Sequence, residues 1–553
     1  MSRLALAPPA HRPATSARET GTATAAILAA LVLALFLAAL AGVLGATGGA
    51  VLYTLDDPYI HLALAEELLK GHYGINPGEA ASASSSILYP LLLAGGLKLG
   101  LGQAAPLVLN LACTLGLVVI LARYLARLGL PPVGTGLPAR LALGLALVLG
   151  LNLVGLAFTG LEHSLHLLVT AGALLGLLVF LEEDRAEAWW LACLVAEPLV
   201  RFEGMGVLAG CLAVVALRGR WHLATGIAAA AASCLLAYVL AMRALGLPPL
   251  PSSVLVKSAS AASGNSGDLL ALPLGLVKTV WHNFVTRAGL LLIAAALALG
   301  GAVLAAPRLV LARGEAGTRA GIALAAFLML AAHLALGSTG WFERYEIYAL
   351  LAAAMGVAAL ARAPLARALR ADRPFIALMA ALGALAVMTP YATATFLTGA
   401  AARNVYLQQY QMHRFVAEYM RAPVAVNDLG WVAYRNDAYV LDLWGLGSEA
   451  ARIARAADNR NPDPSAAWLD RLAREKGADL AMIYDSWFPR RPAGWVRLGQ
   501  LNLGGRAITS AGDAVSFYAT RPEAVPGLTA KMRAFSATIP APASLTGPDG
   551  RPL

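Results

Sequence analysis

Charged residues are the scarcest feature of this 553-residue sequence. Only 13% of its residues are Asp, Glu, Lys or Arg, whereas 59% are hydrophobic. An average soluble domain has about 25% charged residues, so the composition indicates a polytopic membrane protein. The net charge is +10, but no basic cluster with interleaved aromatic residues is present, which argues against a nucleic-acid partner. A basic excess in cytoplasmic loops is typical of membrane proteins.

Cysteine is also scarce, and no cysteines have CxxC spacing. The four cysteines lie inside apolar runs and are predicted to be small core residues rather than a disulfide framework or a metal site; they are Cys113, Cys193, Cys211 and Cys234. The sequence contains no glycine-rich loop of the kind that cradles phosphates.

Long apolar runs dominate the first 400 residues and predict about eleven membrane spans, since roughly 20 apolar residues cross a bilayer. Residues 1–22 are predicted to be a disordered cytoplasmic tail. The first run is too long for the ~7–15-residue core of a cleaved signal peptide. The predicted spans are 23–47, 104–126, 138–158, 162–181, 187–200, 204–217, 222–244, 284–306, 319–337, 346–362 and 374–397.

The positions of the arginines predict the orientation of the spans. Alternating the eleven runs places most loop cations, such as those of 123–140, 308–319 and 362–373, on one face, which is therefore predicted to be cytoplasmic. The run 87–101 is short for a span, and counting it would put these arginines outside. We therefore expect 87–101 to be a helix lying at the interface.

The composition changes at about residue 398, where polar residues return and apolar residues come in short bursts. Strands are predicted at 423–427, 438–443, 479–484 and 514–519, and helices at 448–457 and 465–476. The predicted architecture is a polytopic α-helical transmembrane domain over 23–397, with a small extracytoplasmic α/β domain over 398–535 and a disordered tail over 536–553.

The first extracytoplasmic loop, residues 48–103, carries two adjacent carboxylates, Asp56 and Asp57, directly after the first span. Residues 57–70 have the apolar spacing of an amphipathic helix. Asp57 suits the N-cap of this helix and Pro58 its first position, which leaves Asp56 without a structural explanation. The pair could supply a general base or bind a divalent cation; helix capping and hydration at the interface are the alternative.

Further ionisable residues fall on the same predicted face. Charge beside a span is costly and points to function, although ion pairs, helix-dipole effects and snorkelling anchors could also account for these positions. Arginine and lysine here could bind a phosphate. The residues are His61, Glu162, His163, Arg201, Glu203, Lys257, Arg344 and Tyr345.

These motifs resemble a known family. The segments 56–60, 71–79 and 84–86 are similar to the first loop of GT-C type glycosyltransferases, most closely the bacterial arabinofuranosyltransferase-like enzymes that use polyprenyl-phosphate sugars. Shorter matches follow in order at 160–163, 201–204, 247–257, 344–345, 426–430 and 441–446.

The resemblance implies sugar transfer from a polyprenyl-phosphate donor to an extracytoplasmic glycan, lipid or protein acceptor at a bacterial inner membrane. Asp56 would be the preferred base, and Asp57 would cap the helix, hold the acceptor or help to bind a cation. Arg344, Arg201 and Lys257 would stabilise the departing phosphate. Residues 252–256 depart from the family pattern, which places the role of Lys257 in question. A divalent cation is the one candidate cofactor.

Two other classes of function compete with this interpretation. A transporter or flippase of a lipid-linked sugar would have polar residues at mid-membrane depth and symmetry between its halves. A membrane-anchored binding or assembly protein would act through the C-terminal domain alone, which leaves the outer-face charges without a purpose.

Overall fold

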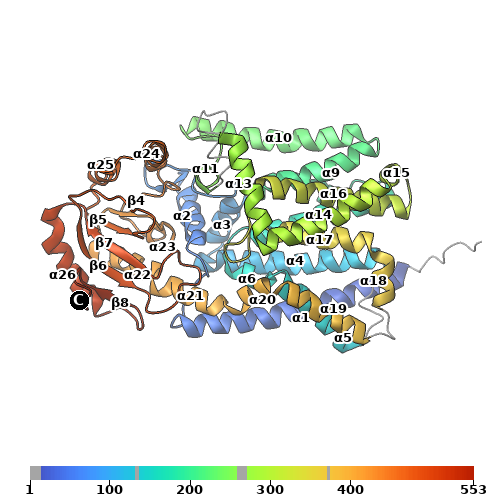
Figure 1. Cartoon of the computed structure of the whole chain (residues 1–553), viewed down its shortest axis with the longest axis horizontal. Helices are drawn as coiled ribbons and strands as arrows, with labels where there is room; N and C mark the ends of the chain where they lie inside the picture. Colours follow the sequence, from blue (N-terminus) through green and yellow to red (C-terminus); the bar gives the residue numbers. More distant parts are fainter. Residues whose placement is uncertain (1–13, 131–135, 258–270, 370–373) are drawn as a thin grey trace, which may run out of the picture.

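The chain forms a helical domain and a C-terminal α/β domain that meet across the first loop (Figure 1). A computed structural model describes residues 14–130, 136–257, 271–369 and 374–553, without the side chains of 14–20, 257, 271–274 and 276. The long helices run side by side, and the α/β domain covers one end of them. The described chain begins at the opposite end.

All eleven predicted spans are helical, but they differ in length. Seven helical segments of the described chain are long and apolar enough to cross a membrane. The number rises to nine if each of two bent helix pairs is counted as one span. The helices are α1 Ala14–Ala46, α4 Ala105–Arg127, α5 Leu137–Gly150 with α6 Leu153–Phe158, α7 His163–Glu183, α8 Ala188–Val200, α9 Gly204–Leu217, α10 Trp221–Ala244, α14 Arg287–Ala305, α16 Glu315–Leu336, α17 Ile347–Leu360 with α18 Arg362–Ala368, and α19 Pro374–Val387 with α20 Thr389–Phe396.

The helices α8 and α9 account for the difference from eleven. They have 13 and 14 residues, which is short of the roughly 20 that cross a bilayer. Their junction at Arg201–Glu203 turns the chain at the end of the helical domain that the α/β domain covers. The chain is therefore a polytopic helical membrane protein whose α8–α9 hairpin places a charged tip at that end.

Short elements connect the spans. The predicted interfacial helix is α3, which has ten residues and is not a candidate span. The helix α13 begins between the predicted spans 222–244 and 284–306. These elements are α2 Asp57–Leu69, β1 Gly74–Asn76, β2 Glu79–Ala80, α3 Tyr89–Lys98, η1 Gly102–Ala104, α11 Ser252–Lys257, α13 Ala271–Val285 and α15 Arg308–Leu311.

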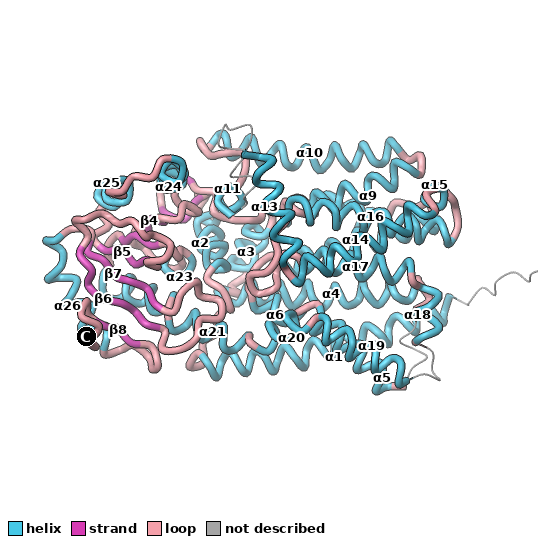
Figure 2. Tube along the Cα trace, viewed as in Figure 1, coloured by secondary structure: helices cyan, strands magenta, loops and turns pink. Residues whose placement is uncertain are grey.

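The C-terminal domain has a six-stranded sheet in the order β4-β3-β5-β7-β6-β8, and Figure 2 shows helices around it. The first three strands in that order are parallel, and the other pairings are antiparallel. The elements are α21 Thr398–Leu407, α22 Gln409–Arg414, η2 Phe415–Met420, β3 Val424–Val426, α23 Gly430–Ala433, β4 Val440–Asp442, α24 Glu449–Arg460, α25 Ala467–Glu475, β5 Leu480–Ile483, β6 Val496–Asn502, β7 Ala514–Ala519, η3 Pro522–Ala524, α26 Val525–Ser536 and β8 Ser544–Thr546.

Two expectations about the ends of the chain are wrong. The tail 536–553 is ordered, because β8 pairs with β6 over Ser544–Thr546 and extends the sheet. At the other end, helix α1 already begins at Ala14, so residues 14–22 are helical rather than disordered. Residues 1–13 lie outside the described chain.

The arginine-rich loops gather at the end away from the α/β domain. There, Arg127 of α4 donates to Glu182 at the end of α7 at 2.8 Å, and Arg220 before α10 pairs with Asp184. Arg362 of α18 pairs with Glu315 of α16. The helices therefore separate a basic end from the end that carries the first loop and the α/β domain.

Candidate functional site

The carboxylate of Asp56 joins the first loop to the C-terminal domain. It accepts hydrogen bonds from the backbone amides of Gly430, at 2.6 Å, and Trp431, at 2.8 Å. Both amides belong to the first turn of α23, which follows β3, and such orphan amides favour an anion. Burial, followed by the charge of Asp428, raises the pKa of Asp56 well above its ordinary value, while the two amides act in the opposite direction.

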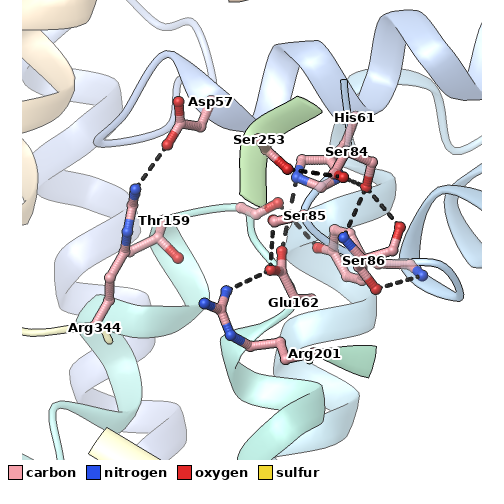
Figure 3. Close-up of polar contacts among 12 residues, drawn as sticks. Asp57, His61, Ser84, Ser85, Ser86, Thr159, Glu162, Arg201, Ser253 and Arg344 are labelled. Carbon is pink, nitrogen blue, oxygen red and sulfur yellow. Dashed lines mark hydrogen bonds and ion pairs between the residues drawn. The ribbon is translucent and has the colours of Figure 1, made fainter. Parts of the chain in front are cut away.

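The predicted capping role of Asp57 is wrong. Helix α2 begins at Asp57 itself, with Asp56 at the N-cap position and no side-chain capping bond. The two carboxylates point to different partners: Asp56 to α23, and Asp57 to the guanidinium of Arg344 at 2.7 Å (Figure 3). Asp56 is therefore not the freer of the two carboxylates, and Asp57 is the one that lines a cavity.

Two further contacts hold the first loop against the α/β domain. The side chain of Asn76 pairs with both backbone groups of Val440, donating to its oxygen at 3.0 Å and accepting from its nitrogen at 2.8 Å. Glu79 accepts from Tyr439 and from Lys476. Asn76 thus provides hydrogen-bond partners for the backbone N–H and C=O of Val440 on the outer edge of β4, which would otherwise be unpaired.

Arg344 reaches Asp57 from a strained turn. Three successive non-glycine residues before it, Trp341, Phe342 and Glu343, have φ between 51° and 63°. The left-handed conformation costs roughly 1–2 kcal/mol for each such residue, and strain of this kind gathers at functional sites. The side chain of Arg344 is only 2% exposed, and that of Asp57 is 25% exposed.

Glu346 holds this turn in place, a role that the sequence did not indicate. Its carboxylate accepts from the amide of Gly340 at 2.8 Å and from the hydroxyl of Tyr391 on α20 at 2.5 Å. Burial, with a further contribution from Glu343, raises the pKa of Glu346 to about 7, against the hydrogen bonds that it accepts. Tyr391 lies on α20, which is distant in sequence and reaches this turn only in the folded chain. The local sequence therefore did not predict the hydrogen bond between Tyr391 and Glu346.

Arg201 is paired with two carboxylates beside this cavity. Its guanidinium donates to Glu162 at 2.6 Å and to Glu203 at 2.7 Å (Figure 3). Burial acts to raise the pKa of Glu162, but Arg201 and His61 outweigh it and hold that pKa below its ordinary value. Ser85 also donates to Glu162, at 2.8 Å. The serine run of the first loop therefore contacts the ion-pair cluster of Glu162, Arg201 and Glu203.

These side chains surround a cavity of about 370 Å³, which falls within the range of ligand sites, roughly 300–1,000 Å³. Of the predicted site residues, Asp57, His61, His163, Arg201, Glu203, Arg344 and Tyr345 line it. Much of the remaining wall is apolar and comes from both domains: Ile60, Leu161, Phe202, Met205, Leu250, Val254, Leu336 and Leu446.

One side of the cavity faces the outside of the helical domain. Met205 at the start of α9 and Leu336 at the end of α16 line it and are 47% and 60% exposed. The cavity therefore has an apolar opening on the outside of the helical domain, at the end that the α/β domain covers.

Several nitrogens around the cavity are buried and have no hydrogen-bond partner among the described residues. They are Nε and Nη1 of Arg344, Nε of Arg201, and Nε2 of His163 and His333. A buried donor left unpaired costs about 1–3 kcal/mol, and such groups in native structures call for a ligand or water to satisfy them. An anionic group in the cavity would meet this need.

Two sequence expectations are not resolved at the site. The side chain of Lys257 lies outside the described part of the structure. For a divalent cation, the described residues contain no group of three or more His, Cys, Asp and Glu side chains placed to hold a metal ion. Asp56 and Asp57 point to different partners, the first to the amides of Gly430 and Trp431 and the second to Arg344.

Comparison with known proteins identifies a domain but no family for the whole chain. Residues 403–518 match a family model described as a domain of unknown function, DUF8728. No curated protein sequence matches. Among solved structures, the chain resembles a cryo-EM structure of a mutant of the arabinofuranosyltransferase AftD from mycobacteria, with a TM-score of 0.43 and 15% identity. The match covers 91% of this chain and 42% of the AftD chain, so this chain spans less than half the length of that enzyme.

Proposed function

We propose that the protein is a GT-C type glycosyltransferase that moves a sugar from a polyprenyl-phosphate donor to a hydroxyl of an extracytoplasmic glycan, lipid or protein. The observation that carries the proposal is the cavity itself. It combines a partly exposed carboxylate, Asp57, with a buried guanidinium, Arg344, that has two nitrogens without a partner among the described residues. Beside them lies an apolar opening on the outside of the helices.

The chemistry needs these three features together. The acceptor oxygen attacks the anomeric carbon of the sugar, the bond from that carbon to the phosphate oxygen breaks, and its electron pair leaves with the polyprenyl phosphate. The proton of the acceptor hydroxyl passes to Asp57. A positioned general base contributes typically about 10²–10⁴-fold, and a preorganised cation favours the charge that develops on the departing phosphate.

The proposal assigns the base to Asp57 rather than to Asp56, because both oxygens of Asp56 bind amides of α23. Arg344 is the main phosphate ligand, since Arg201 is already paired with two carboxylates. Lys257 remains a candidate second cation. The lipid tail would lie against the exposed side of α9 and α16, where Met205 and Leu336 open the cavity.

The orientation follows the positive-inside rule. The basic end of the helices would face the cytoplasm of a bacterial inner membrane, together with the N-terminus. The cavity and the α/β domain would then face the periplasm or its equivalent, where a lipid-linked phosphate lies at the headgroup level.

The purified protein should release polyprenyl phosphate from one member of a panel of polyprenyl-phosphate sugars, followed by mass spectrometry, with the sugar appearing on an added acceptor. Asp57→Asn and Arg344→Gln should each lower transfer by about 10²-fold or more. If no donor of the panel is consumed, or if Asp57→Asn transfers sugar at the wild-type rate, the proposal fails. Movement of an intact donor between leaflets without cleavage would indicate a flippase instead.

A further inference from the structure

We infer that the donor itself switches on the base: the phosphate and Asp57 compete for Arg344, so that Asp57 becomes an effective base only after the donor has bound. The inference rests on the proposed function and adds regulation to the same site. It starts from the ion pair between Asp57 Oδ2 and Arg344 Nη2, at 2.7 Å.

An ion-paired carboxylate is a poor base. A cation within about 4–6 Å favours the charged form of a carboxylate and lowers its affinity for a proton. Among the described neighbours of Asp57, Asp56 is bound to α23, and Arg201 is neutralised by Glu162 and Glu203. His61, one turn along α2, contacts Ser84 and lies near Glu162. His163 and Tyr345 also line this side of the cavity.

Arg344 can receive a phosphate without leaving its place. Its Nη2 contacts Asp57 and the hydroxyl of Tyr345, whereas Nε and Nη1 have no partner among the described residues. A guanidinium binds phosphate through two parallel hydrogen bonds along an edge that pairs Nη2 with either Nε or Nη1. A phosphate that uses an open nitrogen of Arg344 therefore shares Nη2 with Asp57. The strained turn and its contact with Glu346 fix the backbone that carries Arg344.

The consequence is an order of events. Once the phosphate shares the charge of Arg344, the ion pair between Arg344 and Asp57 weakens. The proton affinity of the Asp57 carboxylate then rises. The acceptor hydroxyl can then give its proton to Asp57 as the sugar is transferred, and the departing phosphate keeps Arg344. After the polyprenyl phosphate dissociates, Asp57 loses the proton to water and pairs with Arg344 again. An acceptor that arrives without donor meets an inactive base.

Binding of a polyprenyl monophosphate tests the competition without requiring turnover. The affinity is measured at a fixed pH of about 8, above the second phosphate pKa of about 6, for the wild type, Asp57→Asn, Arg344→Gln and the double variant. Asp57→Asn should bind about tenfold more tightly, ~1.4 kcal/mol, and this gain should vanish when Arg344 is already replaced.

Glu203→Gln is the matched control. It removes a carboxylate from the same cavity, but one that pairs with Arg201 rather than Arg344. Its effect on affinity should be the same with and without Arg344. If the gain from Asp57→Asn persists in the Arg344→Gln background, or if there is no gain, the competition is refuted. If the wild type and all variants fail to bind the lipid phosphate, the proposed function fails.

A kinetic measurement tests the switch in the working enzyme. The acid limb of the pH profile of kcat/KM for the donor reports the pKa of the base in the free enzyme. The acid limb of the kcat profile reports its pKa in the enzyme with substrates bound. Since the donor releases Asp57 from Arg344, the acid limb of kcat should lie at higher pH than that of kcat/KM. Coincident limbs, in an enzyme that does transfer sugar, would overturn the inference and leave the proposed function standing.

Discussion

Exchanging Asp56 and Asp57 for asparagine, one at a time, should separate a structural carboxylate from a catalytic one. In Asp56→Asn, one amide of α23 can still donate to the remaining oxygen, but the other meets an NH₂ group. A buried amide without a partner costs about 1–3 kcal/mol. The pKa of Asp56 is raised by burial, so removal of its charge gives back part of this cost, and we expect a net loss of stability at the lower end of that range, about 1 kcal/mol.

Asp57→Asn should abolish transfer. Its oxygen can still accept from the guanidinium of Arg344, but that buried guanidinium loses its counter-charge. We therefore also expect a loss of stability of up to about 3 kcal/mol, so the loss of transfer, rather than the change in stability, separates the two variants.

Thermal unfolding in detergent and limited proteolysis of the 398–424 junction measure the first effect, and release of polyprenyl phosphate measures the second. Gly430→Ala is an independent control, because a Cβ at Gly430 would overlap the backbone oxygen of Asp56. It should loosen the α/β domain although both carboxylates remain. A stable but inactive Asp56→Asn, beside an active Asp57→Asn, would refute the assignment of both residues.

Three further predictions concern the surroundings of the site. The pKa of Glu346 is raised by burial to about 7 from 4.5, so the folded state binds the proton more tightly than the unfolded state, and stability should decline as pH rises from 4.5 through about 7. Glu346→Gln should flatten the melting-temperature profile over this pH range. An unchanged profile would contradict the assignment. Asn76→Ala, which strips both partners from Val440, should cost about 1–3 kcal/mol. It should also make the α/β domain more sensitive to protease than Asn436→Ala, which removes side-chain bonds to Val432 and Ala438 within that domain. A periplasm-active reporter fused after residue 398 should give activity, whereas a cytoplasm-active reporter working there would overturn the orientation.

Much of the helical domain was predictable because its signal is local. Apolar length marks a membrane helix wherever it occurs, and each of the eleven predicted runs is helical. The α8–α9 hairpin shows the limit of this rule. Its two runs are as apolar as the others, but Arg201 and Glu203 interrupt them, and the structure shows these two residues as an ion pair at the tip of the hairpin.

The strands of the C-terminal domain were predictable in part. Short apolar bursts predicted β3, β4, β5 and β7, which the structure confirms. The strand β8 was missed because its 536–553 segment has the composition of a disordered tail. It is ordered through backbone pairing with β6, and such pairing leaves little trace in side-chain pattern.

The sequence by itself determined that this is a polytopic membrane protein with an α/β domain, and that ionisable residues gather at one end of its helices. Only the tertiary structure decided which of two adjacent aspartates faces the cavity. The partners of Asp56 lie 374 and 375 residues away, and the partner of Asp57 lies 287 residues away. Local spacing could place both carboxylates at the start of a helix, but it could not assign their partners. Hydrogen bonds and ion pairs depend on distances in space, which the folded chain alone sets.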